Sequence, residues 1–316
     1  MDFNDINLNL SWGDLAKNTN YKEKEQKSYK DERFWTLTRD ENGKGAAIIR
    51  LLPDKNSTPF VSLFNCGLRE YNEADKKYYW YIRDLPSTIK APDPLNELWS
   101  SLYEFGGAGI EEAKSFGRRE TFITNIYVVK DPANPENNGK VFLWKFGKKL
   151  LDKFMTALNP SESERELGEK PKELFNPLKG NNIALKIKNV AGFPNYDDTS
   201  IQEESKVFKS EDEAKKAIFE KTYELKEFCN IDYFEPYEDL KKDLVNFCKK
   251  YRTKHMNQED FDKIVSKVFK VEIGNSYTPQ VSQKETKPES KPTQTEPKKE
   301  IKENDNIDDL LDELDI

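Results

Sequence analysis

The stretch RRETFITNIYVVKDPANPENNGKVFLWKFGKKLLDKF, residues 118–154, decides the fold that we expect for this chain. Its apolar, β-branched run at 123–129 predicts a buried strand, and the proline- and asparagine-rich segment 131–139 predicts a turn that returns the chain. A second strand is predicted at 140–146, where alternation places three aromatic rings on one face. These rings belong to Phe142, Trp144 and Phe146.

Basic residues flank this predicted hairpin at both ends. They are Arg118, Arg119, Lys145, Lys148 and Lys149. Aromatic side chains stack on unpaired bases and cations neutralise phosphates, so the combination is typical of a surface that binds single-stranded nucleic acid. The alternative is a core hairpin with a solvated basic rim, and the composition of the stretch fits both interpretations.

The segment VVKDPANPENNGKVFLWKFGKKLLDKF, residues 128–154, closely resembles the single-stranded DNA-binding (helix-destabilising) protein of T-even-type tailed bacteriophages. Three further segments resemble the same family in the same order along the chain. They are GKGAAIIRLLP at 43–53, GNNIALKIKNVAGFPNYDDT at 180–199 and NIDDLLDELDI at 306–316. In this order, the three segments look like the first core strand of that family, its last core strand with the following turn, and its acidic C-terminus.

The resemblance implies an α+β fold with an OB-fold-like β-barrel core, helical additions and a disordered acidic C-terminal tail. Residue patterns predict further strands at 46–52, 59–66, 77–82 and 183–190, a helix at 95–105, and three helices within 210–269. The expected organisation is an N-terminal arm at 1–30, a core at 31–274 with the barrel and C-terminal helices, a flexible linker at 275–302 and an acidic partner-binding tail at 303–316.

The resemblance also implies a set of DNA-binding residues. The rings expected to stack on bases, or to pack beside them, are Phe122, Trp144, Phe193 and Tyr196. The cations expected to neutralise phosphates are Arg50, Arg118, Arg119, Lys145, Lys148 and Lys149. Arg50 lies within an apolar strand, so its alternative is a structural bond to a carboxylate or a backbone group. The alternative for the two rings at 193–196 is a role as packing anchors.

The charge of the chain is divided unevenly. It contains 51 basic and 58 acidic side chains, a formal net charge of −7, and seven of the acids but no base lie in 303–316. The remainder therefore holds 51 of each sign and is neutral, and a neutral body still binds phosphates if positive charge gathers on one surface. In the tail, carboxylates interleave with apolar residues. A purely solubilising tail does not require the apolar residues, so we expect this tail to dock on phage replication and recombination proteins. The residues expected to make this contact are Asp308, Asp309, Leu310, Leu311, Asp312 and Leu314.

The chain has too few and too scattered cysteines for a disulfide framework: Cys66, Cys229 and Cys248. The best-known member of the resembled family holds a zinc ion with one His and three Cys, and Cys66 stands at the position of that His. No Cys or His lies within 67–228, although tetrahedral zinc needs about four N or S ligands. We therefore expect no cofactor. The residues expected to pack where the metal would have been are Leu95, Leu98, Trp99 and Leu102.

The ends of the chain bear on its location and self-association. No run of about 18 apolar residues predicts a membrane span, and the acidic N-terminus lacks the features of a secretory signal. With the resemblance, this predicts the cytoplasm of an infected bacterial host. In the family, a basic cluster in the N-terminal arm contacts neighbouring protomers on DNA. The first ten residues here contain no Lys or Arg, so segment 22–30 is the candidate substitute.

Two other classes of function compete with this expectation. A metal-dependent nuclease needs convergent carboxylates, and those in the predicted turns show no recognisable spacing; no Walker or GxGxxG phosphate loop is present either, so we expect no enzyme. An RNA-binding OB-fold regulator stays open, because stacking and phosphate contacts do not separate RNA from DNA. The expected function is sequence-tolerant coating and protection of single-stranded DNA during phage replication, recombination and repair.

Overall fold

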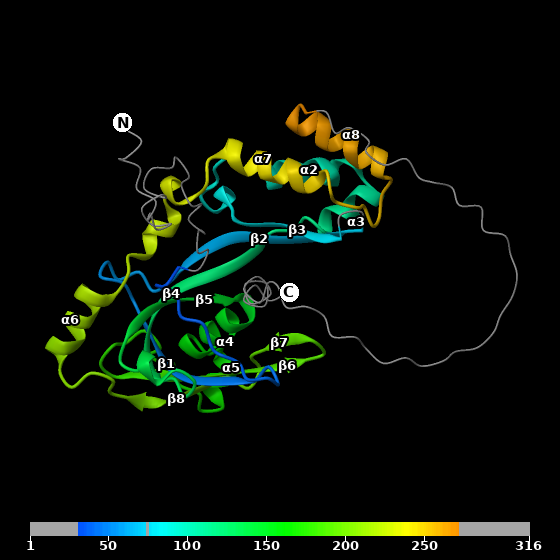
Figure 1. Cartoon of the computed structure of the whole chain (residues 1–316). Helices are drawn as coiled ribbons and strands as arrows, with labels where there is room; N and C mark the ends of the chain where they lie inside the picture. Colours follow the sequence, from blue (N-terminus) through cyan, green and yellow to red (C-terminus); the bar gives the residue numbers. More distant parts are fainter. Residues whose placement is uncertain (1–30, 74–75, 272–316) are drawn as a thin grey trace, which may run out of the picture. The chain divides into compact units, whose positions relative to one another are not determined.

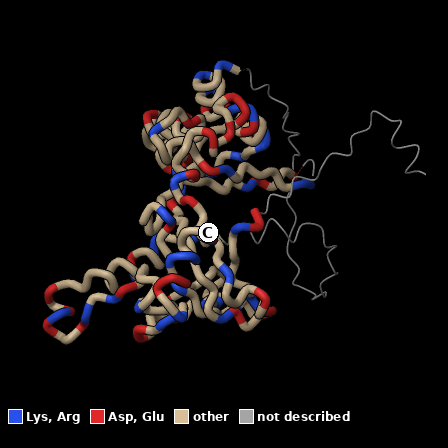
Figure 2. Tube along the Cα trace, turned by 90° about the vertical axis from the view of Figure 1, so that its left-hand side faces the viewer, with Lys and Arg blue, Asp and Glu red and all other residues tan. Residues whose placement is uncertain are grey.

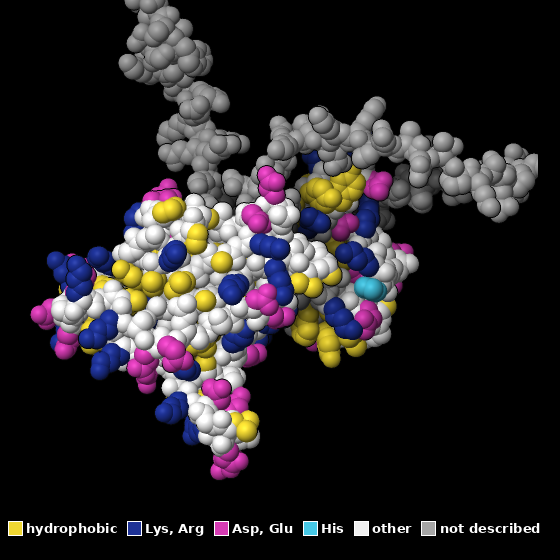
Figure 3. Space-filling model, turned by 90° about the horizontal axis from the view of Figure 1, so that it is seen from below, with side chains coloured by type: hydrophobic (Ala, Val, Ile, Leu, Met, Phe, Trp, Pro, Cys, Tyr) yellow, Lys and Arg dark blue, Asp and Glu magenta, His cyan; other side chains and the backbone are white. Residues whose placement is uncertain are grey.

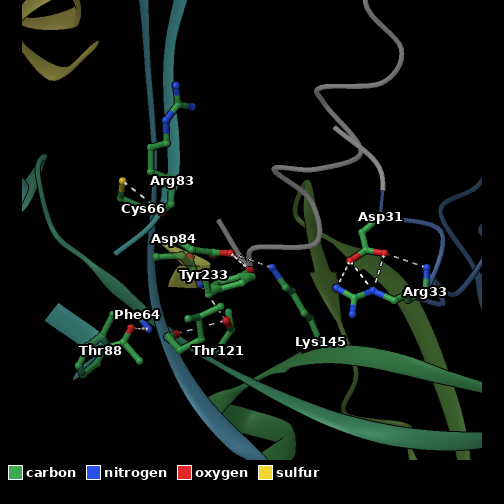
Figure 4. Close-up of polar contacts among 12 residues, drawn as sticks. Asp31, Arg33, Phe64, Cys66, Arg83, Asp84, Thr88, Thr121, Lys145 and Tyr233 are labelled. Carbon is green, nitrogen blue, oxygen red and sulfur yellow. Dashed lines mark hydrogen bonds and ion pairs between the residues drawn. The ribbon is translucent and has the colours of Figure 1, made fainter. Parts of the chain in front are cut away.

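The computed structural model describes residues 31–73 and 76–271. The chain divides into two compact units, Met1–Phe34 and Trp35–Ile316. In the described part of the first unit, the Arg33 guanidinium pairs with the Asp31 carboxylate at 2.7 Å (Figure 4). The predictions for the N-terminal arm, the linker and the acidic tail lie outside the described residues.

The second unit is organised around a long strand, β4 (Arg119–Lys130), in an eight-stranded antiparallel sheet. Two strands share one edge of β4: β2 (Val61–Asn72) pairs with its first half and β1 (Gly45–Leu52) with its second half. Strand β5 (Val141–Gly147) pairs with both halves, and therefore occupies the opposite edge. The hairpin predicted from 118–154 is thus confirmed at the centre of the sheet.

The sheet extends outward from both strands that share this edge. Strand β2 pairs with β3 (Lys77–Asp84), and β1 pairs with β6 (Gly180–Val190). Strand β6 in turn pairs with β7 (Phe193–Asn195) and β8 (Ser200–Ser205). The α+β class is confirmed. Among the described residues no ladder closes the sheet on itself, so the OB-like barrel stays a prediction.

One group of helices lies over the β2–β3 part of the sheet, and another lies beside the part formed by β1, β5 and β6 (Figure 1). The α-helices are α2 (Pro94–Phe105), α3 (Ala108–Lys114), α4 (Lys148–Leu158), α5 (Glu162–Glu166), α6 (Glu211–Lys221), α7 (Tyr237–Cys248) and α8 (Gln258–Phe269). Short 3-10 turns are η2 (Pro86–Ile89), η3 (Pro135–Asn137), η4 (Leu225–Cys229) and η5 (Ile231–Tyr233). The predicted helix at 95–105 and the three helices within 210–269 are confirmed as α2 and as α6, α7 and α8.

Local sequence explains where these helices begin. The Asp93 carboxylate accepts from the backbone N–H groups of Leu95 and Asn96, and Pro94 occupies the first turn of α2, where a missing N–H costs nothing. The Ser210 hydroxyl caps α6 in the same way by accepting from the N–H of Glu213 at 3.2 Å. Both caps satisfy donors that a helix start would otherwise leave unpaired.

Two large hydrophobic clusters hold the unit together. The first is formed by residues of the β2–β3 ribbon and of helices α2, α7 and α8, and Figure 1 shows these helices lying over the ribbon. It includes Cys66, Leu68 and Tyr81 from the strands and Leu95, Leu98 and Leu102 from α2, and Trp99 packs against it. The packing expected for these α2 residues is confirmed. The second cluster joins β1, β4, β5 and β6 to Leu150 and Phe154 of α4.

The turn between β4 and β5 is fixed by one buried carboxylate. Asp131 accepts from the indole Nε1 of Trp35 at 2.9 Å, and also from the side chain of Asn137 and the backbone N–H groups of Ala133 and Asn134. Burial by itself would raise the pKa of Asp131, but these hydrogen bonds outweigh it and hold the pKa below its usual value. The carboxylate therefore stabilises the turn in its ionised form.

Charge is finely mixed along the described chain. Figure 2 shows short basic and acidic segments following one another, and Figure 3 shows basic, acidic and hydrophobic side chains intermingled on the face that it presents. Within the described part of the chain, no helix is both long and apolar enough to cross a membrane.

Candidate nucleic-acid interface

The structure brings most of the predicted cations to one end of the β4–β5 ladder. Strand β4 begins at Arg119 and β5 ends at Gly147, and the two strands are antiparallel, with Thr121 opposite Gly147. Residues 118–119 and 148–149 therefore lie at the same end, although they are far apart in sequence. Arg118 and both lysines are exposed, and Arg119 is half-buried.

Helix α4 starts at this basic end without a side-chain cap. Its N-cap residue is Gly147, and its first turn holds Lys148 and Lys149 but no acidic residue. The start of a helix carries a partial positive charge and unpaired N–H groups, so it favours a bound anion. Lys148 also forms an ion pair with Asp152 one turn later. The uncapped start and its flanking cations together are suited to holding a phosphate.

The hairpin formed by β6 and β7 presents an exposed ring, and the segment after β7 is bonded to α4. Phe193 is 57% exposed and follows a tight turn in which Gly192 has a φ of 88°, a conformation that favours glycine. The Lys153 ammonium of α4 donates to the backbone oxygens of Asp197 (2.8 Å) and Thr199 (2.5 Å). These bonds tie the connection between β7 and β8 to α4. Tyr196 is partly buried and packs against the second cluster.

Two predicted stacking residues lie in the core instead of on the surface. Phe122 and Trp144 are each only 4% exposed and belong to the second hydrophobic cluster. Trp144 stacks on Phe146 with ring centroids 5.0 Å apart, and Phe154 of α4 contacts both rings. Alternation correctly placed the rings on one face, but α4 covers that face. The expectation that Phe122 and Trp144 meet bases is therefore corrected.

Arg50 is fully buried, which corrects its expected contact with DNA. Its guanidinium donates to the side chain of Asn182 at 2.9 Å, to the backbone oxygen of Asn176 at 2.9 Å, and to both oxygens of Ser205. A Cβ on Gly180 would come within 2.7 Å of Arg50 Nη1, so the guanidinium is also tightly enclosed. Burial lowers the pKa of Arg50 to about 10. Arg50 joins β1 to β6 and β8.

Lys145 lies on the sheet face opposite Trp144. Its ammonium is 3.6 Å from the carboxylate of Asp84, which also accepts from the hydroxyl of Tyr233 (Figure 4). Asp84 ends β3, and Tyr233 belongs to η5, so this contact joins three segments that are distant in sequence. Lys145 is half-buried and already paired with a carboxylate that a phosphate would have to replace.

A second group of exposed rings was missed by the interpretation of the sequence. Tyr71 and Tyr78 on the β2–β3 hairpin are 43% and 52% exposed, and the Arg69 guanidinium lies over the ring of Tyr78. The alternating aromatic segment KYYWYI at 77–82 was predicted only as a strand. The alternation within this segment was the missed signal. It places Tyr78 and Trp80 on one face of the strand, next to the strand that holds Arg69.

The residues of the corresponding zinc region do not fit a zinc site. Cys66 is buried among leucines, its thiol lies within hydrogen-bonding reach of the backbone oxygens of Tyr81 and Arg83, and burial raises its pKa. Zinc binds the thiolate, which burial of this kind disfavours. Within residues 31–73 and 76–271, no three His, Cys, Asp or Glu side chains group closely enough to hold a metal ion.

The fold and this surface define the class: an α+β protein with an eight-stranded antiparallel sheet, four cations at one end of its central ladder and an exposed ring on the β6–β7 hairpin. Residues 43–248 match the family model described as gp32 DNA binding protein like, and the chain belongs to that family. It is 36% identical over 218 residues to the single-stranded DNA-binding protein of Enterobacteria phage T4, and this match covers 67% of this chain and 69% of the relative. The phage T2 protein of the same description is 36% identical over 223 residues, with the same coverage.

Proposed function

We propose that this protein binds single-stranded DNA without marked sequence preference. The observation that carries the proposal is that Arg118, Arg119, Lys148 and Lys149 all lie at the end of the β4–β5 ladder where α4 begins without a side-chain cap. Cations and a helix N-terminus together suit phosphates, and the exposed ring of Phe193 suits an unpaired base. The phage T4 and T2 relatives are both described as single-stranded DNA-binding proteins, which supports the same ligand here.

The proposed binding mode combines two kinds of contact, neutralisation of phosphates and stacking on bases. The four cations and Lys145 neutralise phosphates, which gives affinity that falls with salt. Phe193 stacks on a base, and the half-buried Tyr196 packs beside it, which gives affinity that tolerates any base. Because the protein prefers the unpaired strand, it shifts the melting equilibrium of a duplex by mass action, and no fuel or active site is needed.

The proposed role is to coat and protect single-stranded DNA during replication, recombination and repair in the infected bacterial cell. The acidic segment 303–316 is proposed to recruit the replication and recombination proteins. Its composition supports this, because carboxylates alternate there with apolar residues that solubility does not require. Contacts between neighbouring protomers on DNA are proposed to involve segment 1–30.

A comparison of homopolymers tests the proposed ligand. We expect poly(dT) to bind more tightly than poly(U) at the same salt concentration, and we expect no strand cleavage when magnesium is added. Equal or tighter binding of poly(U) would instead indicate an RNA-binding regulator. Magnesium-dependent cleavage by the purified protein, lost in the Lys148→Gln/Lys149→Gln variant, would indicate a nuclease.

A further inference from the structure

Four side chains share one face of the β2–β3 hairpin. The register pairs Arg69 with Trp80 and Tyr71 with Tyr78, and residues two apart on a strand point to the same side. We call this group the hairpin platform. It lies on the solvent side of the ribbon, since the opposite face carries Leu68 and Tyr81 and is covered by the first hydrophobic cluster.

The rings of the platform lie close together, and Tyr71 and Tyr78 are exposed while Trp80 is half-buried. The Tyr71 and Tyr78 centroids are 4.9 Å apart with an interplanar angle of 55°, and Tyr78 and Trp80 are 5.9 Å apart at 41°. The Arg69 guanidinium lies 4.9 Å from the Tyr78 centroid and 5.3 Å from that of Trp80. Exposed aromatic surface is costly in water, and these rings do not contribute to the first hydrophobic cluster, which packs on the other face of the hairpin.

The platform continues the face that carries two of the proposed phosphate contacts. On β2, Asn65 is paired with Arg119 of β4 on one side and with Asp84 of β3 on the other. Asp84 in turn contacts Lys145. Tyr78 lies six residues before Asp84 on the same strand and the same face, a distance of roughly 20 Å. An extended strand of DNA leaving Lys145 along β3 would therefore reach the rings.

We propose that the hairpin platform is an accessory stacking site for unpaired bases, which lengthens the DNA footprint beyond the basic end of the β4–β5 ladder. This rests on the proposed function. Base–aromatic stacking needs only exposed ring faces, and Arg69 adds a cation without imposing a sequence. The alternative is that the same rings dock another protein. Continuity with Lys145 and Arg119 favours DNA.

Oligonucleotide length separates the platform from the rest of the interface. The test measures binding of oligothymidylates of about 6 and about 16 nucleotides, within the ~4–16-nucleotide range of one OB-fold site. We expect Tyr71→Ala/Tyr78→Ala to weaken binding of the longer oligomer about ten-fold, the value of roughly one lost stack, and to leave the shorter one unchanged. The salt dependence should not change, because no phosphate contact is removed.

Two matched variants control for folding and for loss of any exposed ring. Tyr71→Phe/Tyr78→Phe keeps the rings and should bind both oligomers like the parent. Phe219→Ala removes a ring that is 75% exposed on α6, away from the hairpin, and should also bind like the parent. As an independent readout, the longer oligomer should quench Trp80, seen as the fluorescence change lost in Trp80→Phe.

The outcomes are distinct. Equal binding of the longer oligomer by the parent and the double alanine variant would overturn the platform, as would the same loss for both oligomers or an unquenched Trp80. In each of these cases the parent still binds the shorter oligomer, so the proposed function stands. A parent protein that binds neither oligomer would overturn the proposed function itself.

Discussion

At the scale of single residues, Asp84 restrains a cation of the proposed interface. Its carboxylate lies 3.6 Å from the Lys145 ammonium, and a phosphate must compete with it. We expect Asp84→Asn to tighten single-stranded DNA binding several-fold at low salt, with the gain shrinking as salt screens both contacts. The amide oxygen introduced by this substitution can still accept from the Tyr233 hydroxyl, so the fold should be retained.

The measurement for this variant is a fluorescence titration at several salt concentrations. Glu259→Gln is the matched control, because it removes the acid of an exposed pair with Lys263 on α8 and should leave DNA affinity unchanged. An Asp84→Asn protein that melts like the parent and binds DNA equally or more weakly would show that Asp84 does not compete for Lys145.

Trp144 is expected to stabilise the fold and not to contact DNA. Replacing a buried aromatic side chain with Ala costs about 3–5 kcal/mol, so Trp144→Ala should unfold at a markedly lower urea concentration. Trp144→Phe should lose less, because it retains a ring against Phe146 and Phe154. The contrary result, unchanged unfolding together with a large loss of DNA affinity, would place Trp144 at the DNA surface.

Residue types in the sequence indicated the chemistry of the interface but not which members are exposed. The acceptors of Arg50 come from residues 126 to 155 positions away in the chain, and they meet only because β6 and β8 pair beside β1. Phe193, in contrast, follows a Gly-containing turn, so local sequence sufficed to predict an exposed ring. The difference is between long-range packing and local turn geometry.

At the scale of elements, periodicity predicted the strands and helices because each pattern is local. The alternation at 140–146 predicted β5, and residue patterns predicted the three helices within 210–269, which are α6, α7 and α8. No local pattern shows that β1 and β2 share one edge of β4, or that α4 covers the aromatic face of β5. Those facts depend on which elements pack together. The predicted site was therefore wrong for Phe122 and Trp144, which α4 covers.

The cluster beneath α2 makes a prediction about metal. Cys66 packs there with Leu95 and Leu98, and no ligand set forms around it among the described residues. We expect purified protein to contain no stoichiometric zinc, and a strong chelator to leave its melting temperature unchanged, because structural zinc contributes directly to folding stability. One tightly bound zinc per chain, measured by elemental analysis, would refute this.

At the scale of the whole molecule, the division of charge predicts competition for the interface. All of the formal excess of −7 resides in 303–316, and seven carboxylates tethered to the same chain act at a high effective concentration. We expect deletion of 303–316 to tighten single-stranded DNA binding at low salt and to abolish binding of replication partners. Unchanged DNA affinity at low salt would remove the competition, and a pull-down with the truncated protein would judge recruitment separately.

In the proposed binding mode, cations at the start of α4 hold phosphates of an unpaired strand. The most direct test is the slope of log K against log salt for poly(dT), measured for the parent and for Lys148→Gln/Lys149→Gln. Each lost phosphate contact lowers the slope by about 0.7, so the double variant should show a slope smaller by about 1.4. Lys263→Gln, on α8, should keep the slope of the parent. A double variant with the slope and affinity of the parent would show that Lys148 and Lys149 do not hold phosphates.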